Sequence, residues 1–393
     1  MSPTSVLAIV LSFAAFAMFS ARPTANRALF FFGLVTLHFA ACIASYAYFQ
    51  TNVTDATGYY YDSLGMNRWP FQLGTVFTVK LVQFLKDIIG GSYFDYFLLF
   101  QTFGIWGLAL LMRTFEEIHE LAGVPPTTAS YLLLVLPGLH FWTSFIGKDA
   151  PLFFAVAICV WATIRLRRRL VGFAIGVGLM VLFRPHIALV TTIALAGAAF
   201  FARGTGPLAR VVLVVVAAAA AGYIATTLES TFHIRFSSAD AVFDWFARQG
   251  EISKQFTSGS AVMNASFPFR LFSLLFRPLF LDAATPMALV ASLENLVMLF
   301  VIGFLIFKWR QMVRVARSAF FVQFAAIFAV VLTILLATVY YNVGLGLRQR
   351  TMIMPALLTV FMALWAVRQR QRAELHAPVP VAPGAVYGPA SPS

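Results

Sequence analysis

Eight ionisable residues of this chain stand at the ends of long apolar segments. If those segments cross a membrane, the charges lie at a depth where charge is costly to keep, and such residues are functional candidates by default. The set combines cations that could bind an anion with carboxylates that could accept a proton. Its members are Asp55, Lys148, Asp149, Arg184, His186, Arg277, Arg348 and Arg350.

The basic members of this set could together bind a phosphate. Guanidinium groups hold phosphate oxygens through paired hydrogen bonds. At membrane depth, the anion to be expected is the phosphate or pyrophosphate of a lipid. The predicted lipid-phosphate ligands are Lys148, Arg184, His186, Arg277, Arg348 and Arg350. Lys148, Arg277 and Arg350 could each instead snorkel to lipid headgroups. His186 could be an ordinary capping or packing residue.

Asp55 is the first candidate for a general base. It opens a polar segment directly after an apolar one, where its carboxylate could accept the proton of an attacking hydroxyl group. Nearby cations would stabilise charge that develops on a departing phosphate. Asp62 and Asp149 are alternatives for this catalytic role. Asp55 could also be an ordinary loop acid, and Asp149 could cap the helix that follows it.

Three aromatic residues near these acids could hold a sugar or an acceptor. Tyr59 and Tyr60 follow Asp55, and Trp142 precedes the Lys148-Asp149 pair. Their rings could stack on a sugar, and the tyrosines could equally belong to an aromatic belt at the membrane interface.

Composition determines which elements must position these residues. The chain has 393 residues, of which 60% are hydrophobic and 11% charged, with a mean hydropathy of +0.83. These values predict an all-α polytopic membrane protein and exclude a soluble globule. We expect about eleven membrane-spanning helices in a single domain, 1–370. The predicted spans are 5–21, 28–48, 94–112, 128–146, 150–164, 171–183, 187–202, 211–227, 284–307, 318–340 and 352–367.

Three of these spans are too short to cross fully. Spans 150–164, 171–183 and 187–202 contain roughly 13 to 16 residues each, or about 20–24 Å, against a hydrocarbon core of about 30 Å. Their outer tips, which carry Lys148-Asp149 and Arg184-Pro185-His186, should therefore lie below the membrane surface. Non-helical backbone at that depth must be buried in protein or line a wet cavity. We expect both tips to share one cavity that opens outward.

Large loops and interfacial helices are predicted on the same side. The external loops are 49–93 and 228–283, and segments 73–89, 238–256 and 269–281 have the character of helices lying along the interface. The segment 340–350 joins the last two predicted spans as an outer loop, and its two glycines permit a close backbone approach to a ligand. The tail 371–393, rich in Pro, Ala, Gly and Ser towards its end, is predicted to be disordered and cytoplasmic.

The basic residues predict topology. The net charge is +13, and more than half of the 28 lysines and arginines fall in loops on one side of the eleven-span arrangement. The positive-inside rule makes that side cytoplasmic, with the N-terminus outside and the C-terminus inside. The charge is therefore a topology signal and predicts no nucleic-acid partner. Glu294, within an apolar span, is expected to be buried and paired.

The order of these motifs resembles one family. Two helices precede Asp55-x-x-x-Tyr59, and the segment Phe141 to Asp149 follows a Pro-Gly pair. Arg184-Pro185-His186 and Arg348-Gln349-Arg350-Thr351-Met352 come later. This layout over most of 1–370 is similar to polysaccharide polymerases of the EpsG and Wzy type, related in architecture to GT-C glycosyltransferases.

The resemblance implies a function. Proteins of this kind use polyprenyl-linked sugars at the outer face of the plasma membrane, in exopolysaccharide or cell-envelope glycan synthesis. It carries the acidic role onto Asp55 and the phosphate role onto Lys148, Arg184 and the Arg348/Arg350 pair. It also implies partners among other envelope-glycan assembly proteins. The chain departs from the GT-C pattern because it lacks a clear paired-acid motif.

A second class of function stays open at this stage. A transporter or flippase for an anionic lipid or solute would need charges reachable from both sides. The charges at the predicted cytoplasmic ends are the basic residues that the positive-inside rule accounts for, which favours the enzyme over the transporter. No cofactor is required by the sequence, and no ligand spacing demands a metal, although a divalent ion would be compatible with it.

Overall fold

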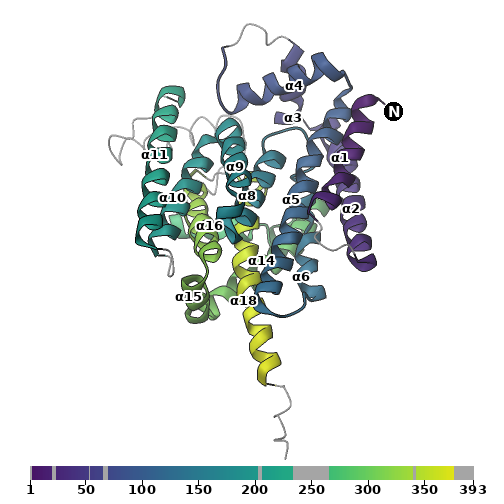
Figure 1. Cartoon of the computed structure of the whole chain (residues 1–393). Coiled ribbons are helices and arrows are strands. Elements are labelled where there is room, and N and C mark those ends of the chain that lie inside the picture. Colours follow the sequence, from purple (N-terminus) through teal and green to yellow (C-terminus); the bar gives the residue numbers. More distant parts are fainter. Residues whose placement is uncertain are drawn as a thin grey trace, which may run out of the picture.

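The computed structural model describes residues 2–19, 24–52, 54–64, 70–201, 206–232, 265–339 and 342–375. Within these residues every regular element is a helix, as predicted (Figure 1). The long helices run side by side between two ends of the molecule. One end carries α3 and α4 and is called the α3–α4 end below; the opposite end carries α15 and is called the α15 end.

The α-helices vary in length from five to 30 residues. The helices of the first half are α1 (Pro3–Phe19), α2 (Ala25–Thr51), α3 (Asp55–Tyr61), α4 (Thr75–Ile89), α5 (Tyr93–Ala122), α6 (Thr128–Leu132), α7 (Pro137–Phe141), α8 (Asp149–Ile164) and α9 (Leu170–Phe183). Those of the second half are α10 (Pro185–Phe201), α11 (Pro207–Phe232), α13 (Phe267–Phe276), α14 (Pro286–Phe307), α15 (Trp309–Ser318), α16 (Phe320–Val339), α17 (Val343–Arg350) and α18 (Met354–Leu375).

Helix α5 lies at the centre of the packing. It contacts α1, α2, α8 and α18, and its buried residues occur on all sides. A helix that is apolar all round belongs inside a protein or a bilayer. A second group, α10, α16 and α18, packs beside it, so the core is continuous from α2 to α16.

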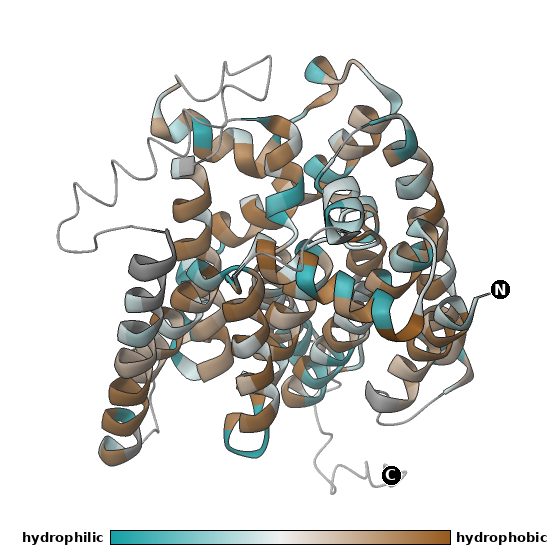
Figure 2. Cartoon of the chain, turned by 90° about the horizontal axis from the view of Figure 1, so that it is seen from above, coloured by the Kyte–Doolittle hydropathy of each residue, from teal (hydrophilic) through white to brown (hydrophobic). Residues whose placement is uncertain are grey.

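Four described helices are long and apolar enough to cross a membrane. They are α2, α5, α14 and α16, the last over Phe320–Thr338; a fifth span results if α17 and α18, bent by 59°, count as one. Several exposed side chains of these helices are large and apolar, including Leu293 and Phe300 on α14. Hydrophobic residues dominate most helical turns in Figure 2. These features are compatible with a membrane protein. By length and hydropathy, four or five described segments could each cross a membrane, fewer than the eleven predicted.

The predicted span 128–146 is not one continuous helix. It divides into α6, the short 3-10 helix η3 (Leu133–Val135) and α7, followed by a non-helical stretch over 142–148. Leu136 precedes a proline and has φ −58° and ψ 123°, because a residue before proline is driven away from the helical region. Pro137 then starts α7 at a position where its missing N–H is not needed.

The three short helices are present almost as predicted. They are α8, α9 and α10, with 16, 14 and 17 residues. The α9–α10 junction is the single extended residue Arg184, with φ −151° and ψ 85°. Pro185 begins α10 directly afterwards, so one residue separates the two helices.

The predicted interfacial segments are helical where they are described. Helix α4 lies across the α3–α4 end of the bundle (Figure 1), and α13 ends before Pro278. The predicted loop 340–350 is wrong from Val343 onward, because Asn342 caps α17 through the Gly344 N–H. Helix α18 continues through residues 371–375, which were expected to be disordered. The segment 238–256, Tyr340, Tyr341 and 376–393 lie outside the described residues.

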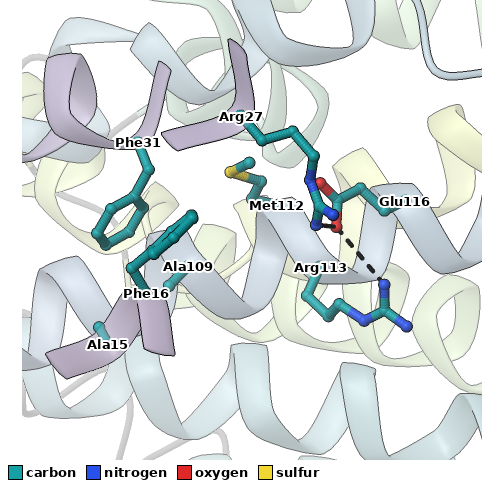
Figure 3. Close-up of a pocket in the computed structure, with 8 residues that line it drawn as sticks. All are labelled: Ala15, Phe16, Arg27, Phe31, Ala109, Met112, Arg113 and Glu116. Atoms are coloured by element: carbon teal, nitrogen blue, oxygen red, sulfur yellow. Dashed lines mark hydrogen bonds and ion pairs between the residues drawn. The ribbon is translucent and has the colours of Figure 1, made fainter. Parts of the chain in front are cut away.

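Ion pairs join the helices towards the α15 end. Arg27 on α2 and Arg113 on α5 both point at Glu116 (Figure 3). Glu117, one residue further, accepts hydrogen bonds from Arg113 Nε at 2.9 Å and from Arg169 Nη2 at 2.9 Å. The turn between α8 and α9 is thereby tied to α5.

Candidate functional site

Four separate segments bring charged side chains together towards the α3–α4 end. Asp55 lies in the first turn of α3, and Lys148-Asp149 stands where the non-helical stretch 142–148 enters α8. Arg184 forms the α9–α10 junction, and Arg348 projects from α17. These five residues are called the charge cluster below. The convergence predicted for the two hairpin tips is thus present.

Asp149 is the buried centre of the charge cluster, with 1% of its surface exposed. Arg184 Nη2 donates to its Oδ1 at 3.1 Å, and Arg348 Nε donates to its Oδ2. Both carboxylate oxygens are therefore occupied by guanidinium groups. As the first residue of α8, Asp149 is further stabilised by the helix dipole. It is a poor general base, because it is buried and both of its oxygens already accept hydrogen bonds from charged donors.

Asp55 is the accessible acid of the cluster. Its Oδ2 accepts a hydrogen bond from Arg348 Nη1 at 2.7 Å, and 56% of its side chain is exposed. Burial alone would raise the pKa of this carboxyl group, but the charge and hydrogen bond of Arg348, with Lys148 and Arg184, hold the pKa below its ordinary value. Asp55 is therefore ionised at neutral pH and can be reached from outside the protein.

Lys148 carries the third cation. Its Nζ donates to Thr75 Oγ1 on α4 at 2.9 Å and lies 5.8 Å from the centre of the Tyr59 ring. Burial, followed by the charge of Arg184, lowers the pKa of Lys148 to about 8. The ammonium group is thus charged at neutral pH and loses its proton just above it.

Two polar atoms in and beside the cluster lack partners among the described residues. Arg348 Nη2 and Thr54 Oγ1 are buried and make no hydrogen bond. A buried donor of a charged group is rarely left unsatisfied in a folded protein. Three cations and two carboxylates give the cluster a formal charge of about +1. An anion that reached Arg348 would meet a free donor and a favourable charge.

Tyr59 is the one aromatic candidate with direct access to this cluster, since its buried ring faces Lys148. Tyr60 turns away: its hydroxyl donates to Gly91 O at 3.1 Å, and Lys86 Nζ lies 3.8 Å above its ring. Trp142 packs edge-on against Phe141 and Phe145. The sugar-binding prediction therefore has no geometric support at Tyr60.

Two other predicted residues lie at the margin. Asp62 is exposed and forms the C-terminal cap of α3, donating its backbone N–H to Gly58 O. The backbone of Asp62 makes this cap, and the cluster cations Arg184 and Arg348 pair with Asp149 and Asp55 instead. His186 lies in the first turn of α10, half-buried, within electrostatic range of Arg184 and Lys148.

Two predicted phosphate ligands are directed elsewhere. Arg277 forms a two-bond ion pair with Asp282, at 2.7 and 3.1 Å. Arg350 is 1% exposed and donates to Glu294 Oε1 at 3.0 Å and to Leu275 O at 2.8 Å. Residues two apart in a helix point about 200° apart, so Arg348 and Arg350 leave α17 on opposite faces. Arg350 is therefore corrected from a ligand to an anchoring residue.

Thr75 and Thr54 were not anticipated. Thr75 lies at the start of α4, which the sequence marked only as an interfacial helix, and no pattern signalled its contact with Lys148. Glu294 was expected to be buried and paired, and this is confirmed by its bond to Arg350.

The chemistry of the cluster fits an anion better than a metal ion. Among the described residues, no group of three or more His, Cys, Asp or Glu side chains is placed to hold a metal. The two carboxylates of the cluster are already bound to guanidinium groups. No protein-family model, curated protein or solved structure matches this chain.

Proposed function

We propose that this protein is a membrane glycosyltransferase of the polysaccharide-polymerase type. It transfers sugar from a donor linked to polyprenyl phosphate or pyrophosphate onto an acceptor hydroxyl group. The reaction takes place on the extracytoplasmic side of the plasma membrane, in exopolysaccharide or cell-envelope glycan synthesis. The observation that carries the proposal is the charge cluster, in which three cations and one accessible carboxylate share a single site.

The cations supply the site for the donor phosphate. Arg348 offers its unpartnered Nη2, and Arg184 and Lys148 add charge from two neighbouring turns. Guanidinium donors that are already held in place by Asp149 need little reorganisation when charge develops on the leaving phosphate. Pre-organisation of this kind is the largest single contribution that such a site makes to a transfer reaction.

Asp55 supplies the base. In the free protein Arg348 lowers its pKa, which keeps the carboxylate ionised but makes it a weak proton acceptor. A phosphate bound to Arg348 would share that guanidinium and place a negative charge beside Asp55. Both effects raise the pKa of Asp55 towards the working pH. The acid thus becomes a better base when the donor is bound.

The proposed orientation places the charge cluster outside. Arg165, Arg167, Arg168 and Arg169 follow α8 at the end opposite Asp149, and a cytoplasmic position for them satisfies the positive-inside rule. The short helices α8, α9 and α10 then leave the cluster below the outer surface. In this arrangement the N-terminus faces out, the C-terminus faces in, and eleven segments cross or enter the bilayer.

The proposal is tested by reconstitution. Purified protein in liposomes is given a polyprenyl-linked sugar and an acceptor, and product formation is compared for wild type, Asp55→Asn and Asp87→Asn. Asp87 is an exposed acid on α4 and serves as the matched control. We expect Asp55→Asn to lower the rate by about 10²–10⁴-fold, the usual contribution of a general base, and Asp87→Asn to retain it. Lipid translocation without sugar transfer in the wild type would reject the proposal in favour of a flippase.

A further inference from the structure

A second buried polar network lies behind the charge cluster. Its centre is Glu294 on α14, 4% exposed, whose Oε1 accepts a hydrogen bond from Arg350 Nη2 at 3.0 Å. The other carboxylate oxygen, Oε2, accepts a short hydrogen bond from the backbone N–H of Gly138, at the start of α7. One carboxylate therefore holds two segments that are far apart in the sequence.

Arg350 distributes its remaining donors over the neighbouring helices. Its Nη1 donates to Leu275 O, at the end of α13, at 2.8 Å, and to Asn295 Oδ1 on α14. Asn295 Nδ2 in turn donates to Pro278 O, just after α13. A fully bonded buried network of this type specifies one arrangement of its members.

Both segments that Glu294 holds lead directly to the charge cluster. Arg348 precedes Arg350 by two residues on α17, so the anchor on one face of that helix sets the rotation of the other face. From Gly138, the chain runs through α7 and the stretch 142–148 to Lys148 and Asp149. Glu294 thus contacts the supports of both Arg348 and Asp149, the two partners of the central ion pair.

Gly138 shows how close this contact is. A Cβ atom on Gly138 would stand 2.6 Å from Glu294 Oε2 and 2.7 Å from Oε1. Any side chain there would push the carboxylate away from α7. Only glycine allows the backbone and Glu294 to approach so closely.

We infer that Glu294 is a positioning residue for the charge cluster, acting through Arg350 on Arg348 and through Gly138 on Lys148 and Asp149. This inference rests on the proposed function for its catalytic consequence. A buried ion pair adds little net stability relative to apolar residues of the same size, so its value lies in fixing one geometry. An error of about 1 Å in the position of a reacting group can cost about 10²-fold in rate.

The test compares two buried glutamates of the same kind. Glu294→Gln removes the charge of the network, whereas Glu116→Gln removes the charge of a buried glutamate that is paired with arginines towards the α15 end. Both should lose stability. With rates expressed per folded molecule and donor saturating, Glu294→Gln should lower kcat by roughly 10- to 100-fold with a smaller change in KM, and Glu116→Gln should leave kcat unchanged. Equal kcat values for the two variants would overturn the inference.

A second variant keeps both charges. Gly138→Ala displaces the Glu294 carboxylate by contact alone, and we expect it to lower kcat in the same direction as Glu294→Gln. If Glu294→Gln fails to fold, this variant decides: a wild-type kcat in Gly138→Ala would contradict the positioning role.

A binding measurement separates this inference from the proposed function. With farnesyl phosphate as the probe, we expect Glu294→Gln to bind roughly tenfold more weakly than wild type, and Glu116→Gln to bind equally. If wild type binds the probe but transfers no sugar, the proposed transferase fails and the positioning role stands on the binding ratio. If Glu294→Gln binds and transfers like wild type, the positioning role fails and the transferase stands. Absence of binding in the wild type overturns both.

Discussion

Substitution by asparagine should affect the two aspartates of the charge cluster differently: stability should fall mainly at Asp149, and sugar transfer should be lost at Asp55. Asp149 is 1% exposed and pairs with both Arg184 and Arg348. Asp149→Asn leaves Arg184 without a counter-charge beside Lys148, and it leaves Arg348 with Asp55 as its one remaining carboxylate partner among the described residues. Removing one partner of a buried ion pair costs about 3–5 kcal/mol, and we expect the free energy of unfolding to fall by that amount.

Asp55→Asn should behave differently. Asp55 forms a single pair with Arg348, and 56% of its side chain is exposed, so solvent screens the interaction. The expected loss in the free energy of unfolding is about 0.2–1 kcal/mol. The assay is chemical unfolding of the purified protein in mixed micelles, with sugar transfer measured on the folded fraction. Asp55→Asn should lose transfer and keep stability, whereas Asp149→Asn should lose stability.

A reversed result would refute this assignment of roles. If Asp55→Asn unfolds as easily as Asp149→Asn, Asp55 is structural and the base lies elsewhere. If Asp149→Asn is as stable as wild type, Asp149 is not the residue that holds the two arginines. A double variant, Asp149→Asn with Arg184→Met, should recover part of the lost stability because it removes one uncompensated charge.

Three further predictions follow from individual contacts. Burial lowers the pKa of Lys148 to about 8, so lipid-phosphate affinity should fall roughly tenfold as the pH rises through that value and the ammonium group is lost. Lys148→Arg should abolish this fall, because a guanidinium group keeps its charge. Binding of farnesyl phosphate measured across this pH range checks both statements. Gly104→Ala places a Cβ against Thr143 O and should cost about 1–3 kcal/mol of stability. Gly33→Ala, inside α2, meets no atom within 4 Å and should raise stability by about 0.4–1 kcal/mol; thermal unfolding of both variants checks this. Glu117→Gln should lower the free energy of unfolding by about 3–5 kcal/mol without changing transfer per folded molecule; a change in transfer would mean that the distant ion pairs act on the site.

Hydropathy and helix length predicted much of the architecture. The short helices α8, α9 and α10 were expected from apolar runs bounded by charged tips, because a run too short for the bilayer must place its tip at depth. The meeting of the Lys148-Asp149 tip with the Arg184 tip was predicted from this reasoning, and the ion pair between Arg184 and Asp149 confirms it. The span 128–146 was not interpreted correctly, because its apolar composition conceals the break that Pro137 imposes at Leu136.

The separation of Arg348 from Arg350 could not be predicted while 340–350 was treated as a loop. Two glycines in that segment suggested irregular backbone, but Asn342 starts a helix there. Once the segment is helical, a spacing of two residues places the arginines on opposite faces. The partners of Arg350 come from α13 and α14, and single-sequence periodicity carries no information about such long-range pairs.

The most direct test is the structure of the protein with a polyprenyl phosphate bound. We expect the phosphate within hydrogen-bonding distance, about 3 Å, of Arg348 Nη2, with Arg184 and Lys148 beside it and the Asp55 carboxylate facing the sugar position. A phosphate bound at Arg277 or at the Arg27–Glu116 cluster, with Arg348 Nη2 still unpartnered, would contradict the account.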